Sequence, residues 1–303
     1  MMLIRLVKFL SVLLLLVNLF LWVRPFALLA LSVVNRSSAC PISRVLQLIR
    51  EDRHCYQVRD RIRQTSRLIK EDPAGFHLWD TPKGPVWIPA DSDRLVAALL
   101  AEQELKIYGT GATGVHPNDV VLDCGAHVGL YTREALAAGA RLVVAIEPAP
   151  GNLECLRRNL AGAIAAGHVV VCPKGVWDRD DYLALSRAPG NSGADRVLAD
   201  QAPTQEWPEV PLITIDRLVD ELKLERVDFI KMDIEGAEQR ALSGARDTLA
   251  RYKPRLAIAG YHRRDDPAKL PALISQAWGG YQMECGLCSE ENGRIRPEVL
   301  FFH

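Results

Sequence analysis

The sequence predicts an α/β fold: a doubly wound, mostly parallel, Rossmann-like sheet. Short apolar runs alternate with helix-like segments from residue 119 onward, which is the pattern of consecutive β-α units. The runs around Val121, Val143 and Ile230 are apolar without alternation, as in parallel strands buried on both faces. Glycine or an acidic residue follows each run. We therefore expect a ligand outside the carboxyl ends of these strands.

The N-terminal part of the chain differs from the rest. At 303 residues and 49% hydrophobic content, the chain can bury one large domain with residues left over. Residues 9–23 are almost wholly apolar, and a second apolar run ends at Val34. We expect residues 1–40 to be a membrane anchor or a signal-like segment, with membrane association through residues 9–34. An uncleaved anchor is favoured, and a cleaved signal is the alternative.

Charge divides the chain in the same way. Residues 1–70 hold twelve Lys or Arg and three acidic residues, a balance of +9, so the remainder carries −9. Residues 41–75 therefore read as a basic helical stalk, and residues 76–303 as an acidic domain. Basic residues that follow an apolar segment favour a cytoplasmic domain at a membrane. An acidic domain is a poor partner for nucleic acid.

Local patterns outline the stalk and the entry to the domain. The stalk is predicted to be helical over residues 43–50 and 56–70, and residues 71–75 interrupt it. Residues 76–80 and 85–89 form a predicted hairpin. Asp91 or Ser92 is expected to cap a helix over residues 93–108.

The centre of the predicted domain is residues 119–147, which read as strand, glycine turn, helix and strand. Asp123 ends the first strand, and Gly125 and Gly129 let the backbone turn tightly and approach a ligand. Glu147 ends the second strand, where the acid of a Rossmann unit hydrogen-bonds ribose hydroxyls. The segment therefore predicts a nucleoside-containing ligand.

The charge of the turn narrows the choice of ligand. A dinucleotide places its pyrophosphate at the helix N-terminus, where the carboxylate of Asp123 would repel it. S-adenosylmethionine carries a sulfonium and an ammonium and no phosphate, so an acidic turn favours it. Gly109-x-Gly111-x-x-Gly114 matches the dinucleotide pattern, but it precedes the strand, and we interpret it as a loop.

The rest of the domain continues the alternation. Further strands are predicted at residues 168–172, 210–215, 227–232 and 256–259, and Asp216 is expected to cap the helix after the second of these. Residues 173–208 form a long polar connection that contains a turn and a minor strand at 182–186. A hairpin around Asn292-Gly293 ends the chain, so the last strand is predicted to be antiparallel.

The cysteines do not indicate a metal site. Cys124, Cys155 and Cys172 fall in predicted core elements and read as reduced, small hydrophobic residues. Cys285 and Cys288 form a lone pair without a second pair at ligand spacing. We therefore predict no metal.

Five motifs, in this order and spacing, carry a resemblance to a known family: Val121-Leu-Asp-Cys-Gly-Ala-His-Val-Gly-Leu-Tyr-Thr132, Ile146-Glu-Pro148, Thr214-Ile-Asp216, Lys231-Met-Asp-Ile-Glu-Gly-Ala-Glu238 and Ala257-Ile-Ala-Gly-Tyr-His262. The chain resembles the FkbM family of S-adenosylmethionine-dependent methyltransferases over roughly residues 76–303. The resemblance implies a class I methyltransferase sheet and O-methylation of a hydroxyl on a sugar or related small molecule. His127 stands where the family often has Asn, and the Cys285–Cys288 segment departs from the family's C-terminal pattern.

Roles follow from the reaction. Methyl transfer to an alcohol aligns the acceptor oxygen with the methyl group and removes the hydroxyl proton. We expect Asp233 or His262 to accept that proton, and Glu235 and Glu238 to orient the substrate or to hold Asp233. The expected catalytic residues are thus Asp233, His262 and Glu235. The expected contacts of S-adenosylmethionine are Asp123, Gly125, Ala126, Gly129, Glu147 and Asp233.

Two alternatives from other classes stay open. One is an oxidoreductase that binds NAD, and the other is a non-catalytic, membrane-tethered protein that binds an adenosyl ligand. The expected partner is a small-molecule or glycan acceptor. The sequence fixes neither that acceptor nor the oligomeric state.

Overall fold

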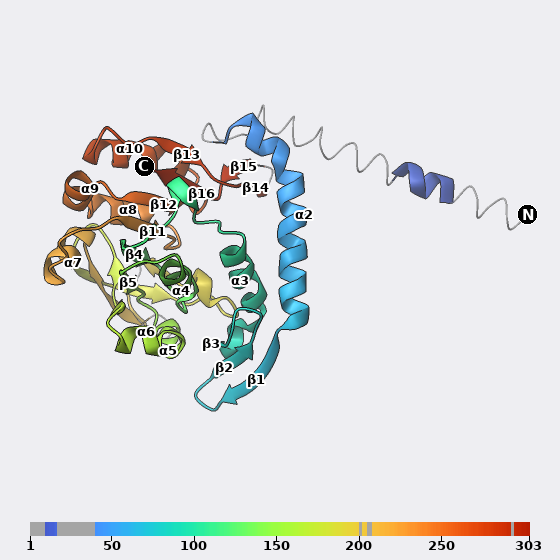
Figure 1. The fold of residues 1–303 in the computed structure, drawn as a ribbon, viewed down its shortest axis with the longest axis horizontal. Helices are drawn as coiled ribbons and strands as arrows, with labels where there is room; N and C mark the ends of the chain where they lie inside the picture. The colour runs from blue at the N-terminus through green and yellow to red at the C-terminus, as the bar shows by residue number, and fades with distance from the viewer. Residues whose placement is uncertain (1–9, 17–39, 200–201, 205–207, 292–293) are drawn as a thin grey trace, which may run out of the picture.

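A seven-stranded sheet lies at the centre of the computed structural model, which describes residues 10–16, 40–199, 202–204, 208–291 and 294–303. The strand order is β13-β16-β12-β11-β4-β5-β6 (Figure 1). The run from β6 to β12 is parallel, and β16 is antiparallel to both of its neighbours. The predicted α/β sheet with an antiparallel C-terminal strand is confirmed. The strands are β4 (Val120–Cys124), β5 (Leu142–Ile146), β6 (Val169–Cys172), β11 (Phe229–Met232), β12 (Arg255–Ala259), β13 (Met283–Cys285) and β16 (Val299–Phe302).

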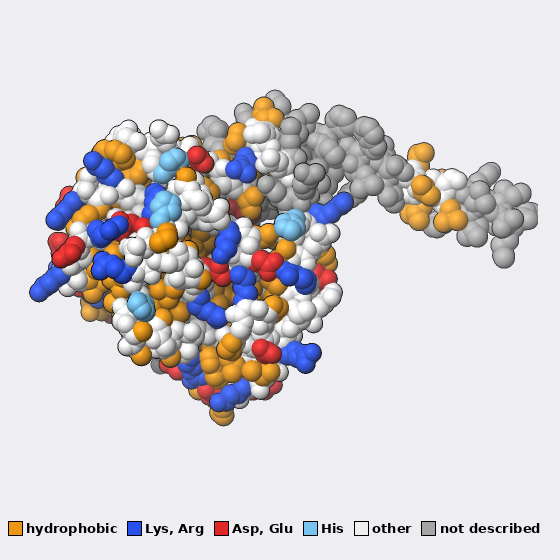
Figure 2. Space-filling model, in the orientation of Figure 1, with side chains coloured by type: hydrophobic (Ala, Val, Ile, Leu, Met, Phe, Trp, Pro, Cys, Tyr) orange, Lys and Arg blue, Asp and Glu red, His pale blue; other side chains and the backbone are white. Residues whose placement is uncertain are grey.

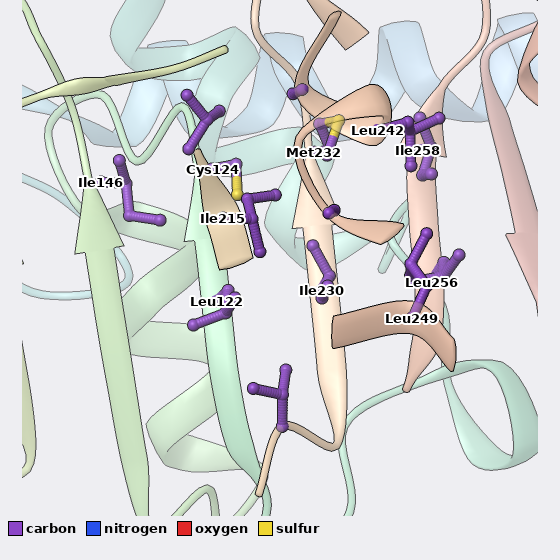
Figure 3. Packing of buried hydrophobic residues seen from close by; sticks show 14 of the residues in the cluster. Leu122, Cys124, Ile146, Ile215, Ile230, Met232, Leu242, Leu249, Leu256 and Ile258 are labelled. Carbon is purple, nitrogen blue, oxygen red and sulfur yellow. The ribbon is translucent and has the colours of Figure 1, made fainter. Parts of the chain in front are cut away.

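Both faces of the sheet are covered, which explains why the strands are apolar without alternation. Leu122 and Cys124 point to one face and pack with Leu218, Leu242 and residues of the helices beyond them (Figure 3). Val121 points to the other face. The helices on the first face are α7 (Ile215–Glu221), α8 (Glu238–Ser243), α9 (Arg246–Tyr252) and α10 (Asp266–Ala277), and those on the second are α4 (Leu130–Ala137), α5 (Pro150–Asn159) and α6 (Ala161–Ala165).

The segment predicted as a stalk is built differently from the expectation. A single helix, α2 (Ile42–Thr65), replaces the two predicted helices, and Arg67–Asp72 forms strand β1 instead of continuing the helix. The turn at Gly75, where φ is +85°, lets β1 pair with β2 (Phe76–Asp80). This pairing overrides the helical pattern of residues 66–70, and β3 (Val86–Pro89) completes a three-stranded meander.

Helix α2 packs against the domain along its length (Figure 1). Val58 and Ile62 are buried with Leu100 of α3 (Val96–Glu104). The division into anchor, stalk and domain stays a prediction, but the described part of the predicted stalk contributes to the core.

The entry to α3 also corrects the prediction. A 3-10 helix, η1 (Ala90–Leu95), precedes α3, and neither helix start has a side-chain cap. The carboxylate of Asp91 instead accepts a hydrogen bond from the hydroxyl of Ser92 at 2.9 Å. Ser92 accepts one from the backbone N–H of Ser192 at 3.0 Å. Both side chains expected as caps thus bond to partners other than the backbone at the start of the helix.

Three short strands of the long connection after β6 join the strand predicted at residues 210–215 in a second sheet, in the order β7-β10-β8-β9, so that the latter strand lies outside the central sheet. The predicted minor strand and the predicted turn are present as β8 and as η3 (Ser192–Ala194). The expected cap of α7 is wrong, because Thr214 accepts the hydrogen bond from Arg217 N and Asp216 accepts from Asp247 N and Thr248 N. The strands are β7 (Gly175–Val176), β8 (Asp181–Ser186), β9 (Arg196–Leu198) and β10 (Glu209–Ile213).

The C-terminal region forms a two-stranded ribbon, β14 (Cys288–Glu291) and β15 (Arg294–Pro297), between β13 and β16. Cys288 forms a disulfide with Cys40, across 248 residues of sequence. Sequence analysis did not predict this bond. Cys124, Cys155 and Cys172 are free, as expected.

The N-terminal apolar segment is only partly described. Residues 10–16 are helical, and the rest of the expected segment 9–34 lies outside the described residues. No helix among the described residues is long and apolar enough to cross a membrane.

Candidate active site

The carboxyl ends of β4, β11 and β12 bring three segments of the sequence together. The strands lie side by side in parallel, with β11 in the middle. Gly125 follows β4, Asp233 follows β11, and His262 lies three residues beyond β12. The backbone N–H of Asp233 donates to the carbonyl of Cys124 at 3.1 Å, which continues the pairing past the strand ends. The sheet itself therefore positions this edge.

Gly125 lets two of these segments touch. Its φ is +78°, and a Cβ atom built on it would lie 1.9 Å from the carbonyl oxygen of Asp233. Only glycine combines this left-handed conformation with such close backbone contact. Gly125 therefore has a structural requirement besides its expected contact with a ligand.

Glu147 lies at the end of β5 with its carboxylate directed at the turn after β4. Oε2 accepts from the backbone N–H of His127 at 2.9 Å, and Oε1 accepts from Ala149 N at 2.9 Å and from Asn152 Nδ2 at 3.3 Å. Burial raises the pKa of Glu147 to about 7, and the hydrogen bonds from Ala149 and His127 oppose that rise. The carboxylate is thus fixed in place at the wall of a cavity.

This cavity, which we call the donor cavity, has a volume of about 50 Å³. A loop of the long connection covers it, because the hydroxyl of Ser192 lies 2.8 Å from His127 Nε2. Burial lowers the pKa of His127 to about 4, so its imidazole is neutral. The lining includes Gly125, His127, Glu147, Asn152, Lys174, Gly175, Ser192, Asp195, Arg196, Asp233 and Glu235.

Two further cavities continue from the donor cavity. The first, of about 80 Å³, shares Gly125, His127 and Asp233 with it and also reaches Ala126, Lys231, Glu102 and Tyr108. The second, which we call the acceptor cavity, has a volume of about 780 Å³ and shares Glu102 and Tyr108 with the first. Its other walls come from α2, α3, the segment after β12 and the C-terminal ribbon with the residue that follows it, and include His54, Cys55, Glu104, Tyr261, Cys288, Glu290 and Glu298.

Three of the expected cofactor contacts, Ala126, Asp123 and Gly129, have different surroundings. Ala126 lines the small connecting cavity. Asp123 is fully buried, accepts from the Thr132 hydroxyl at 2.6 Å and faces Lys231 Nζ at 3.4 Å, and it lines none of the cavities described above. Gly129 begins α4 at a φ of +86°, where a Cβ would meet Leu160 at 2.8 Å. Asp123 therefore pairs with Lys231. Gly129 allows α4 to pack closely against Leu160.

Asp233, Glu235, Glu238 and His262 form one cluster, which we call the acid–histidine cluster. His262 Nδ1 lies 2.8 Å from Glu238 Oε1, and Nε2 lies 3.4 Å from Asp233 Oδ1 and 3.5 Å from Glu235 Oε1. The other oxygen of Asp233 accepts from the Tyr108 hydroxyl at 2.5 Å. All three residues predicted to be catalytic are thus brought together.

The cluster holds a proton and has unused polar atoms. Burial lowers the pKa of His262, but the close contacts with the carboxylates of Glu235 and Glu238 and the charge of Asp233 outweigh it and raise the pKa to about 11. His262 is therefore an imidazolium at neutral pH. Asp233 Oδ1, Glu238 Oε2 and His262 Nε2 are buried atoms that have no hydrogen-bond partner among the described residues. Buried polar groups without partners are rare, and such atoms fit a site that completes its contacts with a ligand.

Sequence analysis missed several residues of this region. Tyr108 and Glu102 lie on or just after α3, where no motif marks them. Asn152 lies on α5, and Ser192 in the long connection. Lys231, by contrast, belongs to one of the sequence motifs, and as a lysine at the end of an apolar strand it pairs with a buried acid, Asp123.

Fold and site together define a methyltransferase-like α/β protein with a ligand edge at the carboxyl ends of its strands. The family model for the methyltransferase FkbM domain matches residues 123–283. The chain belongs to the FkbM methyltransferase family.

Individual relatives are distant. The chain is 28% identical to 31-O-demethyl-FK506 methyltransferase FkbM of Streptomyces tacrolimicus, over 44% of this chain and 62% of that protein. It is 25% identical to the hexuronic acid methyltransferase AglP of Haloferax volcanii, over 53% of this chain and 63% of that protein. The chain thus spans less than two thirds of the length of these curated relatives.

A solved structure is similar in fold. The methyltransferase FkbM from Methylobacillus flagellatus KT matches with a TM-score of 0.50 and 21% identity, over 86% of this chain and 62% of that one. At this identity the match supports the fold alone.

Proposed function

We propose that the protein transfers a methyl group from S-adenosylmethionine to a hydroxyl group of a small molecule, of a sugar or glycan-related kind. One observation carries the proposal: the acid–histidine cluster borders both the donor cavity and, through Tyr108, the acceptor cavity. A methyl donor and an acceptor in these two cavities would meet at Asp233. The names of the two relatives, one of which acts on a hexuronic acid, agree with such an acceptor.

The residues of the donor cavity fit S-adenosylmethionine. Glu147 would accept hydrogen bonds from the ribose hydroxyls, and Asp233 and Glu235 supply negative charge for a cationic ligand. Lys174 also lines the cavity, but it lies 3.3 Å from Glu221. When bound, S-adenosylmethionine supplies an electrophilic methyl group on a sulfonium.

The turn after β4 disfavours the NAD alternative. A pyrophosphate needs free backbone N–H groups at this turn. The N–H groups of Gly125 and Ala126 both donate to the carbonyl of Ile146 at 3.0 Å, and that of His127 donates to Glu147. Since three successive amides are already used, the turn is poorly suited to a phosphate.

The cluster can remove the acceptor proton once its own proton has left. His262 holds a proton because carboxylates surround it. A positive charge bound beside Asp233 and Glu235 competes for the same carboxylates and lowers the pKa of His262. His262 Nε2 then releases its own proton to solvent and can accept the hydroxyl proton, while Glu238 accepts a hydrogen bond from Nδ1–H and fixes the ring.

The charges on the face shown in Figure 2 agree with a small-molecule acceptor. Figure 2 shows Lys and Arg interspersed with Asp and Glu on the face in view, without a continuous basic area. Nucleic-acid binding needs such an area. The face in view thus gives no support to a nucleic-acid acceptor.

The test measures binding and turnover separately. The purified full chain is titrated with S-adenosylmethionine, S-adenosylhomocysteine and NAD by calorimetry, and labelled methyl transfer to a panel of sugars and glycans is followed by mass spectrometry. We expect binding of the two adenosyl ligands and not of NAD. Asp233→Asn and His262→Gln should lower turnover by at least a hundredfold, within the range general-base catalysis contributes.

Glu225→Gln, at an exposed position after α7, is the matched control and should retain turnover. Tight binding of NAD, or full turnover by both cluster variants, would refute the proposal. Binding of the adenosyl ligands without any methyl transfer would favour the non-catalytic alternative.

A further inference from the structure

Three cysteines that are far apart in the sequence meet beneath the N-terminal end of α2. Cys40 precedes α2, Cys285 ends β13 and Cys288 begins β14. Cys40 and Cys288 are joined by the disulfide. The sulfur of Cys285 lies 3.5 Å from that of Cys288 and 3.9 Å from that of Cys40. A free thiol thus lies next to a formed disulfide.

We propose that Cys285 exchanges with the Cys40–Cys288 disulfide, so that the N-terminal end of α2 is held either covalently or only by packing. The Cys285 thiolate attacks the sulfur of Cys288. A Cys285–Cys288 bond forms, the Cys40–Cys288 bond breaks, and Cys40 leaves as a thiolate that takes up a proton. One disulfide and one thiol are present before and after, so the step needs no oxidant or reductant.

Two observations favour attack on Cys288 over attack on Cys40. The sulfur of Cys288 is the nearer of the two. Cys285 and Cys288 are also separated by two residues only, so that the new bond closes a short loop, as in the Cys-x-x-Cys pairs of disulfide oxidoreductases. The released residue is then Cys40, which lies on the other side of the contact.

The surroundings set the rate of the exchange. Burial raises the pKa of Cys285 to about 11, and the charge of Arg44 opposes that rise only in part. The thiolate is therefore scarce at neutral pH. As long as the pH is below the pKa, each increase of one pH unit raises the thiolate fraction about tenfold. The exchange is slow at pH 7 and accelerates in alkaline solution.

The exchange changes what holds α2 to the C-terminal ribbon. Val45 and Leu48 of α2 pack with Ile295 of β15 around the disulfide. After exchange, this small apolar contact holds the first turns of α2 without a covalent bond. Because Cys288 and the following residues of β14 also line the acceptor cavity, the exchange would loosen one of its walls. Only this last consequence rests on the proposed function.

The test follows the linkage itself, in the wild-type full chain. The protein, purified without reductant, is incubated at pH 7 or pH 9, quenched in acid, labelled with N-ethylmaleimide and mapped as non-reduced peptides by mass spectrometry. We expect both the Cys40–Cys288 and the Cys285–Cys288 linkages. The initial rate at which label appears on Cys40 should rise roughly a hundredfold from pH 7 to pH 9.

Two variants sharpen the result. Cys285→Ser should keep the Cys40–Cys288 linkage and leave Cys40 unlabelled at both pH values. Cys55→Ser, which alters another cysteine of α2, should behave as the wild type. Amide hydrogen exchange of residues 42–48 should be at least tenfold faster in the exchanged form than in Cys285→Ser.

Two results would overturn the inference. One is a Cys40–Cys288 linkage that persists alone at pH 9 while Cys285 takes all the label. Another is the absence of any disulfide, with three thiols that a metal chelator exposes together. Neither result depends on methyl transfer, so failure here is distinguishable from failure of the proposed function.

Discussion

Gly125 allows a sharp test of how the strand ends are assembled. Gly125→Ala places a methyl group 1.9 Å from the carbonyl oxygen of Asp233, at a φ of +78°. The left-handed conformation costs about 1–2 kcal/mol for a non-glycine residue. Relief of the overlap requires backbone movement, at a further cost of about 1–3 kcal/mol. We expect the free energy of unfolding to fall by roughly 2–5 kcal/mol in total.

Gly167→Ala is the matched control for that measurement. Its φ is +77°, nearly the same as that of Gly125, but a Cβ there meets nothing within 4 Å. Urea denaturation of this variant should therefore show the conformational cost alone, about 1–2 kcal/mol. The difference between the two variants isolates the steric contact with Asp233. Equal losses of stability would show that β4 and β11 are not in contact at Gly125, and the reasoning about the site would fail.

Three other perturbations have defined outcomes. Glu147 keeps a proton up to a pKa of about 7 in the folded state, against 4.5 in the unfolded chain, so its contribution to stability is lost as the pH rises from 4.5 to 7. Glu147→Gln should flatten that part of a pH series of urea midpoints, and an unchanged series would contradict the burial argument. Glu238→Gln should lower the pKa of His262 from about 11 by roughly two to three units, followed by NMR titration of the imidazole. The stability that the His262 proton provides is complete below pH 6.5, the ordinary pKa of histidine, and is lost as the pH approaches the pKa of His262 in the folded protein. This loss should therefore be complete at a lower pH in the variant than in the wild type. Ile62→Ala, in the buried face of α2, should lower the free energy of unfolding by about 2–5 kcal/mol, whereas Ile69→Ala on exposed β1 should lower it little. Equally small losses in the two variants would show that α2 is a stalk separate from the domain.

The sheet could be predicted because its signals are local and agree with one another. Each central strand is apolar on both faces, and each is followed by a helix of suitable length, so pattern and topology pointed to the same answer. The acid–histidine cluster followed from the same rule, since residues after parallel strands meet at one edge. Asp233, Glu235 and His262 were therefore placed together from the sequence.

The errors come from contacts between distant parts of the chain. Residues 67–70 carry no clear signal for a strand, and they pair with residues 78–80 only because the turn at Gly75 returns the chain. The link between Cys40 and Cys288 spans nearly the whole chain, so spacing could not reveal it.

The cluster and the acceptor cavity differ in where their residues come from. The residues proposed for donor binding and proton transfer, from Gly125 to His262, lie within the segment that the FkbM family model matches. Apart from Tyr261, the acceptor cavity is lined by residues before 109 and after 286, outside that segment. A protein with this division can keep one reaction while its acceptor changes. Exchange of the N-terminal helix and the C-terminal ribbon between relatives should therefore alter the preferred acceptor, while the affinity for S-adenosylmethionine stays the same. If the exchange changed only the affinity for S-adenosylmethionine, the acceptor would bind outside the acceptor cavity.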